Sequence, residues 1–214
     1  MKLIREITEA VNTITEESDG KKTLYITGPF LVSERKNKNN RMYKEETLRT
    51  EVSRYTQEYI SKNRAFGELG HPDTPTINLD RVSHLIVDLH QEGTDWIGKA
   101  KILDTPAGNI ARGLIEGGAQ LGVSSRGMGS LKNIDGINVV QDDFCLATAA
   151  DIVADPSAPG AFVQSIVEGK EWMLVDGIWT EMQYSQAKQE IQKASRKQIE
   201  QVSLRIFENF IKKL

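Results

Sequence analysis

The chain has few of the residues that mark several classes of protein. It contains one cysteine, which cannot form an internal disulfide, and this fits a reducing intracellular compartment. Acidic residues interrupt the first twenty positions, so we expect neither a signal peptide nor a membrane span there. The formal net charge is -3 and the basic residues are dispersed, which argues against general nucleic-acid binding. With three histidines, the candidate catalytic bases are few.

The length of 214 residues allows one full hydrophobic core with appendages. We expect a central domain over residues 21–183. In the leader, residues 1–20, apolar side chains at positions 3, 7, 11 and 14 predict an amphipathic helix that either packs on the core or detaches to contact a partner. The tail, residues 184–214, has no glycine or proline and is predicted to form a long amphipathic helix.

Alternating and helical patterns divide the central domain into strands and two helices. Helices are predicted over 44–61 and 107–116, the second capped by Thr105. Asp135-Gly136 marks a tight turn, and the runs 82–90 and 96–103 flank a polar turn and predict a hairpin. The full set of strand-like runs is 22–34, 82–90, 96–103, 121–125, 137–140 and 144–153.

Proteolysis by a serine needs a hydroxyl, a base, a group that orients the base, and N–H donors for the oxyanion. His71 follows a glycine and precedes a proline in 67–73 (GELGHPD), a loop position suited to a base that meets substrate. Asp151 is an acid within an apolar strand, and a buried carboxylate requires a partner such as histidine. Each residue alone also fits an ordinary loop or strand-end role.

A serine pair, Ser124 and Ser125, lies where a strand enters a glycine-rich turn, in 122–130 (GVSSRGMGS). The backbone can approach a substrate closely at such a turn. The N–H groups of Arg126 and Gly127 are therefore candidates for an oxyanion hole.

Four segments together resemble the prohead core protein proteases of T4-like phages in order and spacing: 40–43 (NRMY), 67–72 (GELGHP), 123–131 (VSSRGMGSL) and 156–159 (PSAP). The resemblance implies an α+β fold similar to herpesvirus assemblin, a compact, mostly antiparallel β-barrel ringed by helices. It implies a serine endopeptidase, whose reaction requires no cofactor. The spacings between His71, His84 and His90 match no compact metal-ligand motif, so no metal is expected. The substrates would be scaffold or core proteins and the major capsid protein, cleaved inside the prohead in the host cytoplasm. A homo-oligomer is compatible with the resemblance, which does not fix the oligomeric state.

The resemblance also assigns roles to single residues. Ser124 matches the nucleophile and His71 the base, with Ser125 as the alternative nucleophile. Asp151 matches the third member of the triad less closely. Because the herpesvirus relatives use a second histidine there, His84 and His90 are alternatives. Both lie in the predicted strand 82–90, six residues apart and therefore on one face.

Members of this family cut after glutamate in a (Leu/Ile)-x-Glu pattern. The pattern predicts self-cleavage after Glu9, which would release the leader, and after Glu168, which would release the tail. A pocket for glutamate needs a cation, for which Arg126 is a candidate unless it pairs with an internal acid. The rival hypothesis is a catalytically inactive structural or scaffold-binding core protein that docks through its amphipathic ends.

Overall fold

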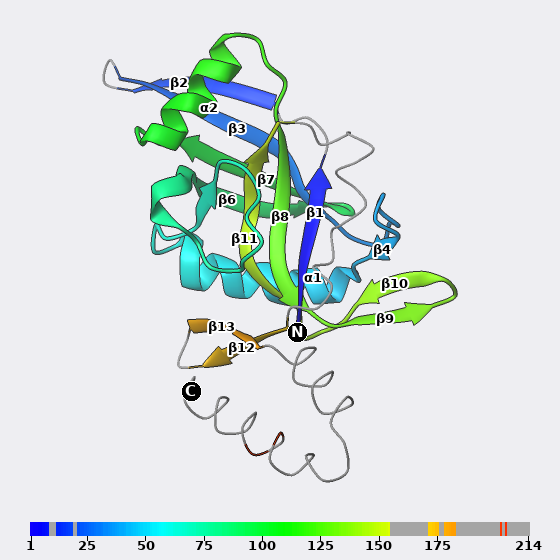
Figure 1. Ribbon diagram of the computed structural model, residues 1–214. Helices are drawn as coiled ribbons and strands as arrows, with labels where there is room; N and C mark the ends of the chain where they lie inside the picture. The colour runs from blue at the N-terminus through cyan, green and yellow to red at the C-terminus, as the bar shows by residue number, and fades with distance from the viewer. Residues whose placement is uncertain are drawn as a thin grey trace.

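The structure, a computed structural model, describes residues 1–8, 12–18, 21–154, 171–175, 178–182, 202 and 204. The described part is an α+β fold with two main sheets in which every pairing is antiparallel (Figure 1). The five-stranded sheet has the order β2 (Asn12–Ser18), β3 (Lys21–Val32), β7 (Asp95–Ile102), β6 (Val82–Glu92) and β5 (Phe66–Glu68). The three-stranded sheet has the order β1 (Lys2–Thr8), β8 (Gly122–Gly129) and β11 (Cys145–Val153).

Shorter elements surround the two sheets. A small sheet contains β4 (Arg41–Met42), β10 (Ile137–Val140) and β9 (Leu131–Ile134), and a separate hairpin contains β12 (Glu171–Val175) and β13 (Ile178–Met182). The helices are α1 (Glu45–Tyr55), the π-helix η1 (Thr56–Ile60), the 3-10 helix η2 (Leu79–Arg81) and α2 (Pro106–Glu116). No helix in the described part of the chain is long and apolar enough to cross a membrane.

The α+β class and the antiparallel sheets are as expected, but the described strands do not close into a barrel. The two main sheets meet at β5 and β11 through an isolated bridge between Leu69 and Ile152. β5 cannot extend this pairing because it has three residues and the chain turns away at Gly70, whose φ is +80°. The α-helical segments α1 and α2 therefore pack on open sheets and do not ring a barrel.

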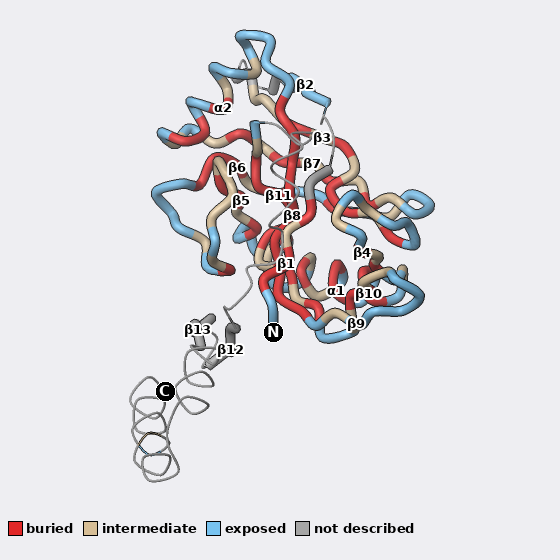
Figure 2. Tube along the Cα trace, turned by 45° about the vertical axis from the view of Figure 1, so that its right-hand side comes forward, coloured by how far each residue is buried: buried red, intermediate tan, exposed pale blue. Residues whose placement is uncertain are grey.

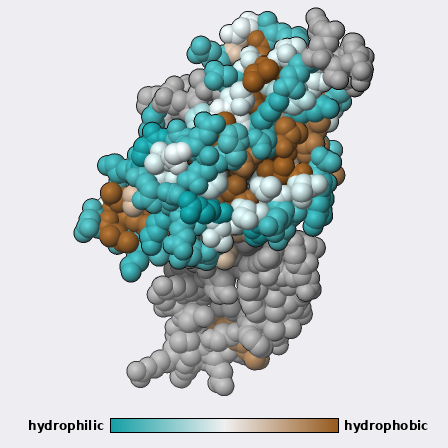
Figure 3. Space-filling view, turned by 180° about the vertical axis from the view of Figure 1, so that it is seen from behind, coloured by the Kyte–Doolittle hydropathy of each residue, from teal (hydrophilic) through white to brown (hydrophobic). Residues whose placement is uncertain are grey.

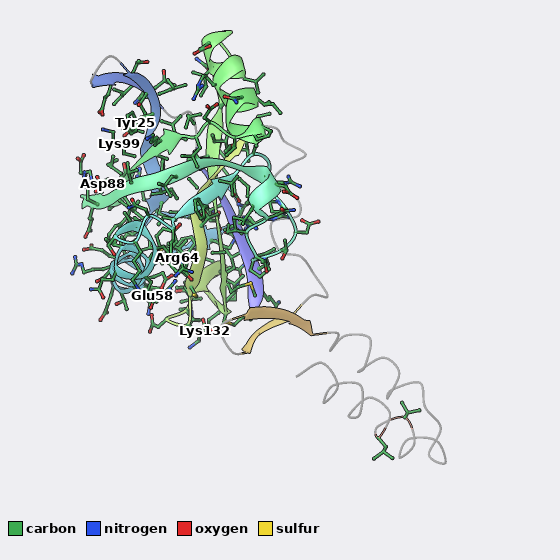
Figure 4. All side chains as sticks on the ribbon, turned by 90° about the vertical axis from the view of Figure 1, so that its left-hand side faces the viewer. Tyr25, Glu58, Arg64, Asp88, Lys99 and Lys132 are labelled. Carbon is green, nitrogen blue, oxygen red and sulfur yellow. The ribbon has the colours of Figure 1, made fainter. Side chains whose placement is uncertain are left out.

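Burial is greatest where the two main sheets and α1 meet (Figure 2). Every residue of β8 is buried, because β8 is the central strand of its sheet and is covered on both faces. The predicted apolar stripe of α1 is confirmed, with Leu48, Val52 and Tyr55 in the core. The five-stranded sheet has a polar outer side, where Figure 4 shows Tyr25, Lys99 and Asp88 on three adjacent strands.

The leader was predicted to be helical, and this prediction is wrong. Residues 2–8 form β1, which pairs with β8, and residues 12–18 form β2, which pairs with β3. The adjacent residues Leu3 and Ile4 are 0% and 1% exposed, because both faces of β1 are covered. Apolar spacing alone could not reveal this, since pairing with distant strands overrides local propensity.

Several local predictions are confirmed. β6 and β7 form the expected hairpin, and the Thr105 hydroxyl caps α2 by accepting the Gly108 N–H at 3.0 Å. Asp135 and Gly136 form a tight turn with positive φ, but it joins β10 to β9, a strand that was not predicted. Figure 3 shows apolar surface at the tip of this hairpin, where Ile134 is exposed.

The predicted tail helix, residues 184–214, lies outside the described residues except for Val202 and Leu204, which are helical. The predicted cleavage sites after Glu9 and Glu168 also lie outside them.

Candidate active site

The structure brings Ser124, His71 and Asp151 into one hydrogen-bonded series. Ser124 Oγ lies 3.2 Å from His71 Nε2, and His71 Nδ1 lies 3.0 Å from Asp151 Oδ2. The three residues come from β8, from the loop after β5, and from β11. Two edges of the fold, the end of β5 and the three-stranded sheet, thus converge as the sequence predicted.

Irregular pairing of β11 places Asp151 on the same face as Ser124. Thr148 lies opposite Arg126, and Asp151 lies opposite Ser124, so three steps along β11 match two along β8. Without the extra residue Ala150 would face Ser124, because a one-residue slip moves every side chain to the other face. Thr148 fills the irregularity, since its hydroxyl donates to the Ala150 carbonyl at 3.0 Å.

Helix α1 stabilises the irregular part of β11. The Leu146 N–H donates to a Glu51 carboxylate oxygen, and the Leu146 carbonyl accepts from Arg54 at 3.4 Å. Glu51 and Arg54 form an ion pair one turn apart on α1. The helix therefore satisfies backbone groups of Leu146, which lies next to one of the register shifts of β11.

Asp151 is a fully buried carboxylate with donors on both oxygens. Oδ1 accepts the Glu68 N–H at 3.0 Å, and Arg126 donates from Nε to Oδ2 at 3.0 Å and from Nη2 to Oδ1 at 3.3 Å. Burial alone would raise the pKa of Asp151, but the hydrogen bond from His71 and the charge of Arg126 outweigh it, so the pKa lies below its ordinary value. Asp151 is therefore ionised and can orient a histidine.

The Arg126 side chain is internal. It is fully buried, it pairs with Asp151, and its Nη2 lies 3.6 Å from Glu68 Oε2. Its remaining donors reach the carbonyl oxygens of Thr74 and Thr76 in the loop that follows His71. Of the two alternatives in the sequence, the structure favours pairing with an internal acid over a glutamate pocket. The side chain of Arg126 thereby joins β8 to the histidine loop.

His84 and His90 do not contact His71 or Ser124 through any hydrogen bond found in the described residues. The His84 ring is buried between the Ser83 hydroxyl, 2.9 Å from Nδ1, and the Ala150 carbonyl, 3.0 Å from Nε2. Burial lowers the pKa of His84 to about 4, so this histidine is neutral. Gly67 makes room for it, because a Cβ there would lie 2.1 Å from His84 Nε2.

The prediction that His84 and His90 share a face is wrong. A register shift in β6 places Ile86 opposite Ala100 but Asp88 opposite Lys99. The extra residue reverses the alternation, so His84 is buried whereas His90 is exposed and pairs with Asp88.

β1 covers the site from the open side of β8. Ile7 lies opposite Ser124, and Arg5 lies opposite Arg126 and pairs with Asp73, two residues after His71, at 2.7 Å. Ser124 is 0% exposed with β1 in this place. Burial lowers the pKa of His71 despite the raising effect of Asp151, so the ring is neutral near pH 7 and can accept a proton.

Ser125 lies on the other face of β8, as expected for the next residue of a strand. It is 2% exposed and lies opposite Glu6 of β1. The geometry thus singles out Ser124 from the serine pair as the one near His71.

Known proteins with the same architecture were found by sequence and by structure. Residues 5–171 match the family described as prohead core protein serine protease. The chain is 35% identical over 161 residues to the prohead core protein protease of Enterobacteria phage T4, which covers 69% of this chain and 74% of that protein. It is also similar to the structure of the bacteriophage T4 capsid assembly protease, gp21, with a TM-score of 0.65 and 30% identity; the match covers 71% of this chain and 96% of that chain.

Proposed function

The chain belongs to the prohead core protein serine protease family and is a capsid maturation protease, and on this premise we propose that Ser124, His71 and Asp151 are its catalytic triad. The observation that carries the proposal is the series Ser124 Oγ, His71 Nε2, His71 Nδ1 and Asp151 Oδ2, with separations of 3.2 and 3.0 Å. A nucleophile, a base and an orienting acid need this connectivity.

The reaction follows from these contacts. His71 Nε2 removes the proton from Ser124 Oγ as the oxygen attacks the scissile carbonyl, and the Asp151 carboxylate stabilises the imidazolium that forms. His71 then donates the proton to the leaving amine, and an acyl-enzyme remains on Ser124. Water, activated by His71, hydrolyses the acyl-enzyme and restores the free hydroxyl. No cofactor takes part in this proposal.

We propose that the backbone N–H of either Arg126 or Gly127 is an oxyanion donor. Adjacent residues of a strand direct their N–H groups to opposite sides, and β8 has β1 on one side and β11 on the other. One of the two N–H groups therefore faces β1. It can receive an oxyanion only when β1 leaves.

Self-cleavage after Glu9 would release β1. The site lies between the end of β1 at Thr8 and the start of β2 at Asn12, so a cut there separates β1 from the rest of the chain. A role for this cut in activation is supported by the burial of Ser124 and by the position of β1 beside it, with Ile7 opposite Ser124. A second cut after Glu168 would release the tail.

The proposed substrates are scaffold or core proteins and the major capsid protein of a phage, cut after glutamate in (Leu/Ile)-x-Glu segments. The relative's name, capsid assembly protease, supports this class of substrate. The reaction would take place inside the prohead, in the host cytoplasm.

A fluorophosphonate label tests the assignment. We expect the full chain, after processing, to carry the label on Ser124, and the Ser125→Ala chain to be labelled as well. The Ser124→Ala chain should be neither labelled nor processed, as measured by intact-protein and peptide mass spectrometry. Labelling of Ser125 would contradict the assignment, and no labelling of any chain would favour an inactive scaffold-binding protein.

A further inference from the structure

On the face of β8 opposite the triad, one glutamate of β1 sits in a closed polar pocket. Glu6 is 8% exposed, and its carboxylate receives side-chain donors from Asn37 at 2.5 Å, Asn39 at 2.9 Å and Tyr43 at 3.3 Å. Arg41 Nε lies 2.9 Å from Glu6 Oε1. A cation and several neutral donors on one carboxylate are what a glutamate-binding site requires.

The loop that forms the pocket is also held by contacts of its own, although Arg41 additionally donates to the Arg5 carbonyl of β1 at 3.3 Å. The Asn37 side-chain oxygen accepts the N–H groups of Asn39 and Arg41 at 3.0 and 2.9 Å, which leaves its amide nitrogen directed at the carboxylate. The Asn40 side chain donates to the Gly136 carbonyl at 2.7 Å, and β4 pairs with β10. The loop is thus anchored to the β9–β10 hairpin and preorganised.

Loss of Glu6 from this pocket would leave polar groups that require a new partner. Arg41 is 1% exposed, and loss of Glu6 would take away the carboxylate that lies 2.9 Å from its Nε. Removing a carboxylate from a buried cation is costly unless another anion or water replaces it. Once β1 departs, the site is therefore prepared for another carboxylate on an extended chain that pairs with β8.

The sequence of β1 matches the pattern expected of substrates. Ile4-Arg5-Glu6 is an Ile-x-Glu segment, and alternation along the strand puts Ile4 and Glu6 on one face. Both side chains are buried, and Ile4 lies in the hydrophobic core cluster. Arg5, the middle residue, points to the other face and pairs with Asp73. An extended strand in this place would therefore be read at alternate positions, apolar and then acidic.

We propose that β1 occupies the substrate groove of the mature enzyme, and that Arg41, Asn37, Asn39 and Tyr43 form its subsite for the glutamate side chain of an acidic, extended peptide. The proposal rests on the proposed function, since it assigns the groove to a peptide substrate. In this register the glutamate pairs with Ser125, and the residue that follows it pairs with Ser124. The bond between them thus lies beside the nucleophile.

A displacement experiment tests the subsite without catalysis. The full-length Ser124→Ala/Glu6→Gln chain keeps β1 but weakens its hold on the pocket. Two acetylated peptides, Leu-Ile-Arg-Glu-Ile-Thr and the same peptide with glutamine for glutamate, are titrated while hydrogen exchange of β1 is followed. We expect the glutamate peptide to expose β1 at a concentration roughly 10- to 100-fold lower, the value for one charge-assisted contact.

Adding Arg41→Gln should make the two peptides equivalent, and adding Tyr43→Phe instead should reduce the preference only a few-fold, because one neutral hydrogen bond is lost. Circular dichroism and thermal unfolding report whether each chain is folded. If the Arg41→Gln chain does not fold, the Tyr43→Phe chain alone tests the subsite. Three results would overturn the proposal. The two peptides could displace β1 equally well with Arg41 present, the preference for the glutamate peptide could persist in both variants, or neither peptide could displace β1. Ser124 is absent from this experiment, so a negative result would reject the glutamate subsite and leave the proposed triad standing. Failure to label Ser124 with the fluorophosphonate would instead reject the protease activity and leave the glutamate-binding pocket standing.

Discussion

Two buried arginine–carboxylate pairs lie on opposite faces of β8, and they differ in how the carboxylate is held. Asp151 and Arg126 lie on the Ser124 face, whereas Glu6 and Arg41 lie on the Ser125 face. Asp151 receives two guanidinium nitrogens, a backbone N–H and the His71 ring. Glu6 has one guanidinium nitrogen, with neutral side-chain donors for the rest.

The pKa values follow this difference. The pKa of Asp151 is lowered, because its partners outweigh burial. The pKa of Glu6 is raised, because burial outweighs Arg41 and the amide donors. The pair of Arg126 and Asp151 thus favours an ionised carboxylate beside His71, whereas the pair of Arg41 and Glu6 is less favourable and holds a strand that is proposed to leave. The same residue types serve different purposes according to the donors around the carboxylate.

The largest expected effect is on catalysis. Asp151→Asn should lower kcat by about 10⁴-fold, the size seen when the acid of a Ser-His-Asp triad becomes an amide. Steady-state cleavage of an Ile-x-Glu peptide measures it, with Asp88→Asn on the exposed side of β6 as the control. A variant that keeps a tenth of the rate would exclude Asp151 from the triad.

Removal of the permanent cation should be the largest effect on stability. In the Ser124→Ala background, Arg126→Met leaves Asp151 and Glu68 buried without it and should cost about 3–5 kcal/mol in the free energy of unfolding. Urea denaturation measures the loss. The matched control, Arg41→Met with Glu6→Gln, removes both charges of the other pair and should cost less. Equal losses would show that the two pairs do not differ as described.

Removal of the other acid should loosen β1. Glu6→Gln places an amide nitrogen, which cannot accept a hydrogen bond, among the side-chain donors of the pocket and should weaken the docking of β1 by about 1.5–3 kcal/mol. Hydrogen exchange of the β1 amides should be faster, and processing after Glu9 should be faster with it. Lys2→Gln, at an exposed position of the same strand, is the control. Unchanged exchange would mean that Glu6 does not hold the strand.

The smallest effect is a difference in pH dependence. The docked state binds a proton on Glu6 more tightly than the free strand does, so docking of β1 should weaken as the pH rises from 4.5 through the raised pKa. Asp151 has the opposite sign, and its contribution to stability is lost only as the pH falls below 3.8 through its lowered pKa. Exchange of β1, corrected for the intrinsic rate, should rise with pH in the native chain and not in Glu6→Gln. If the exchange rate of β1 does not change with pH in either chain, the proposed difference between Glu6 and Asp151 is wrong.

Local patterns predicted much of the fold and the residues of the site. The hairpin of β6 and β7, helix α1 and the Thr105 cap follow from periodicity and from capping chemistry. The glycine-rich turn predicted after Ser124 is wrong, because residues 122–129 form one buried strand, β8. His71 does lie in a loop, as its glycine and proline neighbours predicted. These features depend on residues that are neighbours in sequence.

The rest depended on pairing between distant segments. β1 has helical apolar spacing, yet it completes the sheet of β8. The register shifts in β11 and β6 decide that Asp151 faces Ser124 and that His90 faces solvent. A bulge leaves no signature in local composition here, because it is stabilised from outside the strand, by Glu51 and Arg54 on α1 in the case of β11.

The sequence by itself determined the α+β class, the family and the residue types proposed for the triad, because these depend on residue types and their order. Tertiary structure alone decided which serine meets the histidine, which carboxylate orients it, and that an arginine in the 40–43 segment meets a glutamate from β1. The physical reason is that strand register sets the face of every side chain, and register is fixed by contacts between segments far apart in the chain.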